Sequence, residues 1–313
     1  MNWGRFLLRR AEQTIPVLFG ISLVVFALLQ LIPGDPALTM LGIHATPESL
    51  AALRHELGLD RPVWEQYVVY VRHLATFDLG ESLKYKTSVS SLLGERLSLS
   101  LQLIAYATLL IVAVALPLGI ASAIWRDSVF DNLVRSALMV TMVMPGFWIG
   151  IILLTVLSLK FGLFPVSGAG DGLVDRLHHL FLPALTIALG IVPILVRALR
   201  HSMLETMRAD YVRTARAKGM SEPGVVRWHV LRNALIPAVT LLGLSVGYLM
   251  GGTVIVENVF ALPGAGKLLV DAISARDYPV VQSTTLVFAV LVVVVNVATD
   301  LIYTLLDPRV QLG

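Results

Sequence analysis

The stretch LSLSLQLIAYATLLIVAVALPLGIASAIW, from Leu97 to Trp125, contains no charged residue. A helix needs about 20 apolar residues to cross the hydrocarbon core of a bilayer, where an ionised side chain is costly. This stretch is longer than that, which favours a membrane-spanning helix. The whole chain agrees, because 56% of its 313 residues are hydrophobic, only 14% are charged, and its mean hydropathy is +0.79. These values are typical of an integral membrane protein.

Working outward from that stretch, we find charge-free windows of about spanning length along the whole chain. Six are present: Gln13–Gly34, Leu97–Trp125, Ser136–Leu159, Leu177–Val196, Asn233–Val256 and Tyr278–Thr299, the last continuing to Leu306. The sequence therefore predicts an all-α polytopic membrane protein with six transmembrane helices. No small-residue cleavage motif closes the first window, so we expect residues 13–34 to be a retained span and not a cleaved signal peptide.

Basic residues predict the orientation of these spans. The tail at residues 1–12 is basic, and the segment at 200–232, between the fourth and fifth windows, is much more so. This segment and its border contain Arg197, Arg200, Arg208, Arg213, Arg216, Lys218, Arg227 and Arg232, against only Glu205, Asp210 and Glu222. Such segments stay in the cytoplasm under the positive-inside rule. With six spans, both termini, including the tail at 307–313, are then expected to be cytoplasmic.

The segment at residues 35–96 has more acidic than basic residues, as expected on the outer side. It is too long for a plain turn, which predicts structure of its own. One helix is predicted to begin at the N-cap Thr46, with Pro47 in its first turn, and to end near Gly58. A second helix is predicted to carry one apolar face, formed by Trp64, Tyr67, Val68 and Val71. We expect a small external helical segment ahead of the main transmembrane domain at 97–306.

The stretch DYVRTARAKGMSEPGVVRWHVLRNALIP, Asp210–Pro237, is a basic segment inside this apolar chain. An apolar stripe with spacings of three and four predicts a helix that leads through it: Leu204, Met207, Tyr211 and Ala215. Gly219 is expected to end that helix in a left-handed cap, and Ser221 to begin a short helix with Pro223 in its first turn. By these patterns alone, the segment is either a lipid-anchored interfacial helix or a docking element for a cytosolic partner.

The order of residues in this segment resembles the cytoplasmic coupling motif of ABC importer permeases, E-A-A-x3-G-x9-I-x-L-P. Aligned on Gly219, Ala215 matches the second alanine of the motif and Leu231 matches its leucine. The strings DYVRTARAKG and LRNALIP are closer to the dipeptide/oligopeptide branch of that family, which also contains permeases for nickel chelates and glutathione.

Further motifs along nearly the whole chain are similar to the same branch. LIPGDPA lies at residues 31–37, LGLDRP at 57–62 and FDLGES at 77–82, in the external segment. ENVFALPGAGKLLVDAISARDYPVV at 257–281 and LDPRV at 306–310 lie towards the C-terminus. Several ordered motifs at suitable spacing make the resemblance specific, where any one of them alone would be weak.

The resemblance implies a non-catalytic permease subunit in a bacterial inner membrane, without a cofactor of its own. It would form the pathway with a second, homologous permease, two cytosolic ATPases would use ATP and Mg²⁺, and an external solute-binding protein would deliver the cargo. The cargo would be a di- or oligopeptide, with a nickel chelate or glutathione as the alternative. Carried over by position, the ATPase-coupling residues would be Arg213, Thr214, Ala215, Gly219, Met220, Ser221, Glu222 and Pro223.

Small residues recur in the fifth window, where Gly243, Gly247 and Gly251 are spaced four residues apart. Such rows let helix backbones approach closely in lipid. The row is expected either to pack within the chain or, as the sharper hypothesis, to face the partner permease beside the pathway. In the second case Ser245 and Tyr248 would supply polar groups nearby.

The loop between the fifth and sixth windows contains ALPGAGKLL, which departs from a phosphate-binding loop. Ala261 stands in place of the first glycine of that pattern, and Leu268 in place of its Ser or Thr. We expect a turn at the outer mouth instead. Glu257 or Asp271 is then predicted to contact the external binding protein.

Other classes of function find little support in the sequence. A metal site at His178 and His179 would need a further ligand, and we expect no other His, Asp or Glu at ligand spacing with them and both to be interfacial. A secondary transporter usually has inverted repeats and ionisable groups at mid-membrane, whereas the first five windows have no charge. A membrane hydrolase would need a nucleophile and base, and no such motif is visible. Asn296 and Asp300, near the end of the sixth window, are expected to snorkel or to hydrogen-bond between helices.

Overall fold

The computed structural model describes residues 3–31, 35–42, 45–76 and 78–306 of the chain. Within these residues the regular elements are helices, apart from one isolated antiparallel bridge between Glu81 and Ser88. The all-α prediction is therefore confirmed. The tail at 307–313, and parts of the motifs at 31–37, 77–82 and 306–310, lie outside the described residues.

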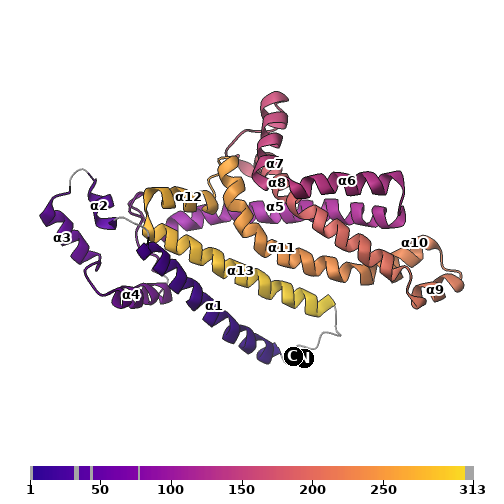
Figure 1. Cartoon of the computed structure of the whole chain (residues 1–313), viewed down its shortest axis with the longest axis horizontal. Coiled ribbons are helices and arrows are strands. Elements are labelled where there is room, and N and C mark those ends of the chain that lie inside the picture. The colour runs from indigo at the N-terminus through magenta and orange to yellow at the C-terminus, as the bar shows by residue number, and fades with distance from the viewer. Residues whose placement is uncertain (1–2, 32–34, 43–44, 77, 307–313) are drawn as a thin grey trace. The chain divides into compact units, whose positions relative to one another are not determined.

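Figure 1 shows the helices, whose longest connections in the chain are residues 76–88 and 161–171. In chain order they are α1 (Trp3–Leu31), α2 (Pro36–Leu41), α3 (Pro47–Glu56), α4 (Val63–Ala75), α5 (Val89–Ile124), α6 (Val129–Val143), α7 (Gly146–Leu153), the π-helical η2 (Leu154–Lys160), α8 (Gly172–Thr206), α9 (Asp210–Ala217), α10 (Glu222–Val225), the π-helical η3 (Val226–Val230), α11 (Leu231–Val259), α12 (Ala265–Ala275) and α13 (Tyr278–Leu306).

Several helices in the described part of the chain are long and apolar enough to cross a membrane. Four qualify on their own: Val89–Ile124, Gly172–Thr206, Glu222–Val259 and Tyr278–Thr299. A fifth span is formed only if Val129–Val143 and Gly146–Lys160, which are bent by 107° against each other, count together. In α1 the described apolar helix covers Glu12–Ala27, which is shorter than a span usually needs. Of the six predicted spans, four to five are thus matched.

The sharp bend at Pro145 replaces the single helix predicted for Ser136–Leu159. A proline disfavours helical backbone in the residue before it, and Met144 is extended, with φ −76° and ψ 131°. α7 begins at Gly146, directly after the proline. A charge-free window has the same composition whether it is straight or bent, so length and hydropathy did not reveal this break.

The chain forms two compact units, one of which comprises Leu101–Leu262 and Val294–Gly313. In this unit α8 packs against α6, α7 and α11 (Figure 1). Gly119 of α5 allows a close approach to α8, because a Cβ at that position would lie 2.9 Å from Leu199 Cδ2. The fourth predicted window is confirmed as a helix, and α8 extends beyond it at both ends.

The other unit comprises Met1–Ser100 and Pro263–Val293. Its helix α3 begins as predicted, because the backbone amide of Ser49 donates a hydrogen bond to Thr46 Oγ1 at 3.2 Å. Gly58, just past the helix, has φ +66°, a conformation that suits glycine. The predicted external helices α3 and α4 are therefore present in this unit.

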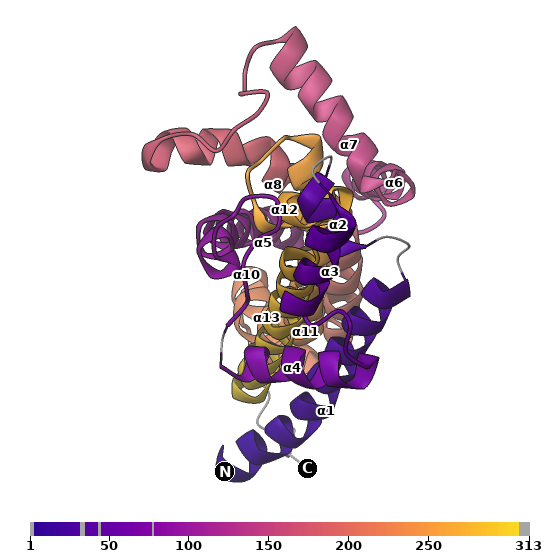
Figure 2. The ribbon, with the colours of Figure 1, turned by 90° about the vertical axis from the view of Figure 1, so that its left-hand side faces the viewer.

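Helix α4 lies against α1, as Figure 2 shows. Tyr67 of α4 meets Phe19 and Phe26 of α1 edge-on, with ring centroids 6.0 Å and 5.3 Å apart. Edge-to-face aromatic pairs of this kind contribute about 1 kcal/mol each. Neither α3 nor α4 has a fully buried residue.

A buried carboxylate, Asp277, holds the loop after α4 against the start of α13 in the same unit. It accepts a hydrogen bond from Ser82 Oγ at 2.5 Å and from the backbone amides of Leu83 and Lys84, each at 3.1 Å. These bonds offset the penalty of burying the charge. Two motifs that are far apart in the sequence, FDLGES and ARDYPVV, are thereby joined.

The turn predicted for ALPGAGKLL is present in the first part of the motif, whereas the second part, from Ala265, is helical. The chain turns over residues 260–264, where Ala261 has φ +49°, and α12 then runs from Ala265 to Ala275. Leu268 and Ala272, four residues apart, are both fully buried on one side of this helix. That spacing of small and apolar residues favours a packed helix over an open loop.

Candidate docking elbow

The basic stretch folds into a bent element, residues 207–230, that we call the elbow. It contains α9, the turn at Gly219, α10 and η3. The prediction of one helix carrying the stripe from Leu204 to Ala215 is wrong, because α8 ends at Thr206 and α9 begins only at Asp210. Ala209 is extended at the start of α9, and the carboxylate of Asp210 stands where a helix N-terminus favours negative charge.

Gly219 makes the turn between α9 and α10. Its φ is +82°, and its amide donates to the carbonyl of Arg216 at 2.9 Å, which confirms the predicted left-handed cap. Ser221 occupies the N-cap position of α10 and Pro223 lies in its first turn, both as predicted. The side chain of Ser221 makes no capping hydrogen bond. The backbone conformation of Gly219 is thus the main local determinant of the bend.

The underside of the elbow is apolar and buried. Val212 and Ala215 of α9, Val225 of α10 and Val230 of η3 all face inward. They join one hydrophobic cluster with Ala123 of α5, Leu199 and Met203 of α8, and Ala234 and Ala238 of α11. Buried apolar contacts of this kind are the main source of stability between helices. The elbow is therefore mounted on the ends of three long apolar helices.

Polar contacts brace the same element. Arg216 donates from Nε to Glu222 Oε1 at 2.7 Å, from Nη2 to Glu222 Oε2 at 3.3 Å, and from Nη1 to the carbonyl of Met207 at 3.3 Å. One guanidinium thus connects α9, α10 and the link from α8. Asn233 of α11 donates to Tyr211 Oη at 2.9 Å and to the carbonyl of His229 at 3.1 Å. These bonds fix the two short helices relative to each other.

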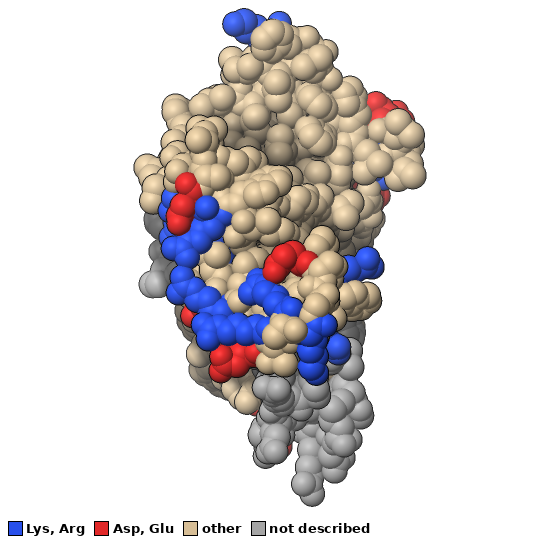
Figure 3. Space-filling model, turned by 90° about the vertical axis from the view of Figure 1, so that its right-hand side faces the viewer, with Lys and Arg blue, Asp and Glu red and all other residues tan. Residues whose placement is uncertain are grey.

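The outer side of the elbow is exposed and positively charged. Lys and Arg side chains gather over the face of the molecule that carries α9 and α10 (Figure 3). Met220, at the tip, is 42% exposed. Seven of the predicted coupling residues are exposed, namely Arg213, Thr214, Gly219, Met220, Ser221, Glu222 and Pro223, whereas the eighth, Ala215, is buried beneath them. An apolar tip inside a rim of cations can dock into an apolar groove with acidic edges.

Trp228 gives the elbow a second exposed apolar group. It is 64% exposed, and the guanidinium of Arg227 lies 5.1 Å from the centre of its ring. An aromatic ring beside a cation suits the membrane–water interface, where one end is apolar and the other is hydrated. The elbow therefore combines a surface suited to a protein partner with one suited to the edge of the bilayer.

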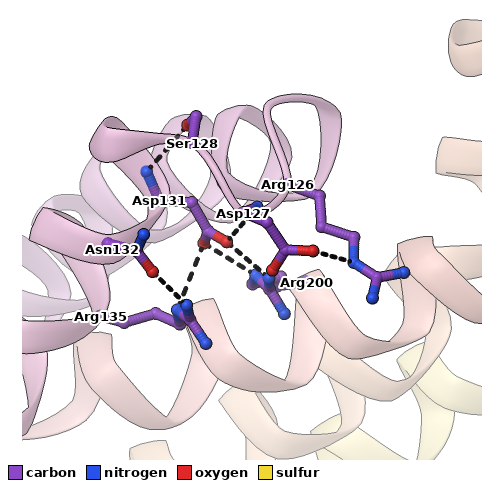
Figure 4. A network of polar contacts seen from close by, with 7 residues as sticks. All are labelled: Arg126, Asp127, Ser128, Asp131, Asn132, Arg135 and Arg200. Atoms are coloured by element: carbon purple, nitrogen blue, oxygen red, sulfur yellow. Dashed lines mark hydrogen bonds and ion pairs between the residues drawn. The ribbon is translucent and has the colours of Figure 1, made fainter.

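A buried ion pair close to the base of the elbow was not anticipated from the sequence (Figure 4). Asp131 of α6 is fully buried and accepts from Arg200 Nε at 2.9 Å and from Arg200 Nη2 at 2.6 Å. The backbone amide of Asp127 donates to the same carboxylate at 3.0 Å. Arg200 follows Leu199 of the elbow cluster in the chain, so this bond fastens α6 to the part of α8 that supports the elbow. The one sequence feature that could have indicated this ion pair is Asp131 itself, the single acidic residue of the otherwise mostly apolar helix α6.

The predicted glycine row on α11 divides into two kinds of position. A Cβ at Gly243 would lie 1.9 Å from Thr299 Cγ2 of α13, so this glycine is required for packing within the chain. Ser245 donates to the carbonyl of Leu241 at 2.7 Å. Further along, Gly247 is partly buried, Tyr248 is 84% exposed, and a Cβ at Gly251 would meet no atom. The second half of the row is the part open to another molecule.

The two acids predicted to contact a binding protein have different surroundings. Glu257 of α11 is fully buried, so its side chain is not presented at the surface. Asp271 of α12 is partly exposed and lies 3.5 Å from Lys267 Nζ. Glu257 follows a charge-free window, which suggested an exposed loop, whereas α11 continues through it to Val259.

The histidine pair is held by local contacts. His178 Nε2 lies 2.9 Å from the carbonyl oxygen of Leu163, and His179 Nδ1 lies 3.4 Å from Asp175 Oδ1. The expectation that no acid stands at ligand spacing is thus corrected by Asp175, one helical turn before His179. Across the described residues, no group of three or more His, Cys, Asp or Glu side chains could hold a metal. Asn296 is partly buried, and the side chain of Asp300 lies outside the described residues.

The fold and the elbow together define a helical membrane protein with a bent, basic element mounted on its apolar helices. The chain belongs to the family described as the binding-protein-dependent transport system inner membrane component, whose model matches residues 115–312. The N-terminal model for the membrane component of the same systems matches residues 3–104. The two models together cover most of the chain.

Relatives of known name match along their whole length. The chain is 42% identical to the di/tripeptide transport system permease protein DppB of Pseudomonas aeruginosa, and the match covers 98% of each chain. It is 38% identical to the dipeptide transport system permease protein DppB of Escherichia coli K12, again over 98% of each. Among solved structures, an inward-facing MetNI methionine ABC transporter matches with a TM-score of 0.58 at 16% identity, over 69% of this chain and 96% of that one. This last likeness concerns the fold alone.

Proposed function

We propose that this chain is the transmembrane permease subunit of an ATP-binding-cassette importer for di- or oligopeptides. The observation that carries the proposal is full-length similarity to two permeases named for dipeptides and for di/tripeptides, at 38% and 42% identity. Membership of the binding-protein-dependent family supports the same class of transport. The chain itself is non-catalytic, and ATP and Mg²⁺ are used by partner subunits.

The proposed topology has six spans with both termini in the cytoplasm of a bacterial inner membrane. Residues 13–34, of which α1 contains those up to Leu31, form the first span. Helices α6, α7 and η2 together form the third, despite the bend at Pro145. Residues 35–96 lie outside, whereas residues 1–12 and 307–313 lie inside. The excess of basic residues on the elbow supports its cytoplasmic side.

We propose that the ATPases act on the elbow when they change between their two conformations. Its exposed tip around Met220 would dock into one ATPase, while the buried cluster under Val212 and Val225 would transmit the movement to α5, α8 and α11. Nucleotide binding in the partner would favour one arrangement of these helices over the other. Access to the pathway would then alternate between the two sides of the membrane.

Other surfaces are assigned to the remaining partners. The exposed half of the α11 row, with Tyr248 and Gly251, is proposed to face the second permease beside the pathway. Asp271 on α12 is the proposed contact for the external binding protein, since Glu257 is buried. Nickel chelates and glutathione remain the alternative cargoes. Uptake of labelled dipeptide, glutathione and nickel chelate by the reconstituted complex distinguishes the three.

The direct test is co-purification of the co-expressed importer with a Gly219→Pro chain. Proline fixes φ near −65° and cannot adopt the φ of +82° that Gly219 has, so the elbow loses its bend. We expect the second permease to stay bound, the ATPases to be lost and uptake to stop. The matched control is Gly58→Pro, which breaks another positive-φ glycine in the external segment and should leave the ATPases bound. Full ATPase recovery with normal uptake in Gly219→Pro would contradict the proposal.

A further inference from the structure

A cavity of about 770 Å³ lies among α6, α8 and α11, apart from the outer side of the elbow. Basic residues line one part of it, and apolar residues line the rest. The residues that matter here are Arg135, Met139, Met142, Ile194, Arg197 and Arg200. All of them belong to the unit that carries the elbow.

The cavity has more positive charge than its surroundings neutralise. Arg200 is bonded to Asp131 at 2.6 Å, and Arg135 lies 3.8 Å from the other oxygen of the same carboxylate. Arg197 donates to the sulfur of Met142 at 3.3 Å, a neutral acceptor. Among the described residues, no carboxylate lies within ion-pair distance of Arg197. Two of the three guanidinium groups therefore share one buried acid and the third has a neutral partner, which leaves the cavity attractive to an anion.

The other walls of the cavity are apolar and exposed. Met139 of α6 is 62% exposed, and Ile194 of α8 is 40% exposed. Met139 and Met142 lie almost one helical turn apart on α6, so their side chains extend the apolar wall along the helix axis. A small inorganic anion would satisfy the arginines but would leave these side chains uncovered.

The cations stand at the end of an apolar span. Arg197 directly follows the charge-free window Leu177–Val196 of α8. In a helix that crosses the membrane, this is the level of the lipid head groups, where basic pockets between helices bind anionic lipids. Cationic groups at one end of an apolar cavity thus match an amphiphile with an anionic head and an acyl tail.

We propose that this cavity binds an anionic phospholipid, with its phosphate diester at Arg197 and Arg135 and an acyl chain along Met139, Met142 and Ile194. The site goes beyond the proposed transport function and does not depend on the cargo. Its position gives it a route to the elbow. Arg200 lines the cavity, holds Asp131 and follows Leu199 of the elbow cluster. A lipid bound in the cavity would therefore contact the same part of α8 that supports the elbow.

The test is lipid retention by the assembled importer, measured by native mass spectrometry after exchange into dioleoylphosphatidylglycerol or dioleoylphosphatidylcholine. We expect the wild-type complex to retain phosphatidylglycerol preferentially. Arg197→Gln should weaken that retention about fivefold, as expected for one cation near the membrane surface. Arg197→Lys keeps the charge and should restore most of it. The matched control is Arg72→Gln, which removes the same charge from the exposed surface of α4 and should change nothing.

Three outcomes would overturn the proposal. Equal retention by the wild type and Arg197→Gln would mean that Arg197 does not hold the lipid. Displacement of phosphatidylglycerol by inorganic phosphate alone would mean that the apolar walls contribute nothing and that the site binds a free anion. Efficient disulfide cross-linking of Met142→Cys to a cysteine placed on the second permease would mean that protein, and not lipid, covers this face.

Discussion

The elbow and the α3–α4 segment both consist of short helices beside the long apolar helices, but they are held in different ways. The elbow buries Val212, Ala215, Val225 and Val230 in a cluster shared with α5, α8 and α11. Helices α3 and α4 have no fully buried residue. Helix α4 contacts α1 through the rings of Tyr67 and Tyr70 and through hydrogen bonds of Tyr67 with Ser22, at 3.0 Å, and of Gln66 with Gln30, at 3.1 Å. Helix α3 is linked to Asp35 through Arg54 at 2.6 Å.

This difference indicates which segment can transmit a force. A helix joined to its neighbours by surface contacts can open locally at little free-energy cost, whereas a helix that shares a buried cluster moves only when the cluster does. Movement of the elbow must therefore displace the ends of three long helices. Helices α3 and α4, which have no buried residue of their own, can move without displacing such a cluster.

The largest expected effect comes from placing a charge beneath the elbow. Val225 is fully buried, and Val225→Asp puts a carboxylate into an apolar cluster without a partner. We expect destabilisation of about 3 kcal/mol or more, with loss of the ATPases from the purified complex. Val68→Asp is the matched change in α4, where the side chain is 57% exposed, and should cost less than about 0.5 kcal/mol. Thermal unfolding in detergent and co-purification measure both variants. Equal destabilisation by Val225→Asp and Val68→Asp would show that the elbow and the α3–α4 segment are not held in different ways.

A smaller effect is expected from the ion pair beside the elbow. Asp131→Asn keeps the shape of the side chain but leaves Arg200, whose side chain is 17% exposed, without its counter-ion. Loss of one partner of a buried pair costs about 3 kcal/mol, and the partial exposure of Arg200 reduces this to about 2 kcal/mol. A double-mutant cycle with Arg200→Gln isolates the coupling between the two residues. Strict additivity in that cycle would show that the pair does not fasten α6 to α8.

The smallest effect is expected from the exposed brace of the elbow. Arg216 and Glu222 have side chains that are 37% and 63% exposed, so solvent screens their pair. Arg216→Ala, Glu222→Ala and the double variant should give a coupling of about 0.5 kcal/mol. The Arg54–Asp35 pair beside α3, with side-chain exposures of 49% and 21%, serves as the comparison. A coupling of several kcal/mol at Arg216 would mean that polar contacts, and not the buried cluster, hold the elbow.

Local features could be predicted from the sequence because their causes lie within a few residues. Gly219 and Thr46 act through their own backbone conformation or a partner three residues away, and both predictions are confirmed. The Asp131–Arg200 pair joins residues 69 positions apart, and no local pattern indicates it. The burial of Glu257 likewise depends on packing that composition does not encode. Gly243 was left open between two roles, and its contact with Thr299 favours packing within the chain.

The most direct test of the account is the labelling of a single cysteine at the tip of the elbow. The chain has no cysteine, so Met220→Cys and Trp64→Cys each introduce one thiol. Trp64 lies in α4 and is 67% exposed, which makes it the matched site in the segment that is proposed to be external. In inverted membrane vesicles treated with a membrane-impermeant maleimide, Met220→Cys should react when the ATPases have been stripped and be protected when they are bound. Trp64→Cys should react only in spheroplasts, with or without ATPases. Labelling of Met220→Cys that is unaffected by the ATPases, or that occurs only from the outer side, would contradict the account.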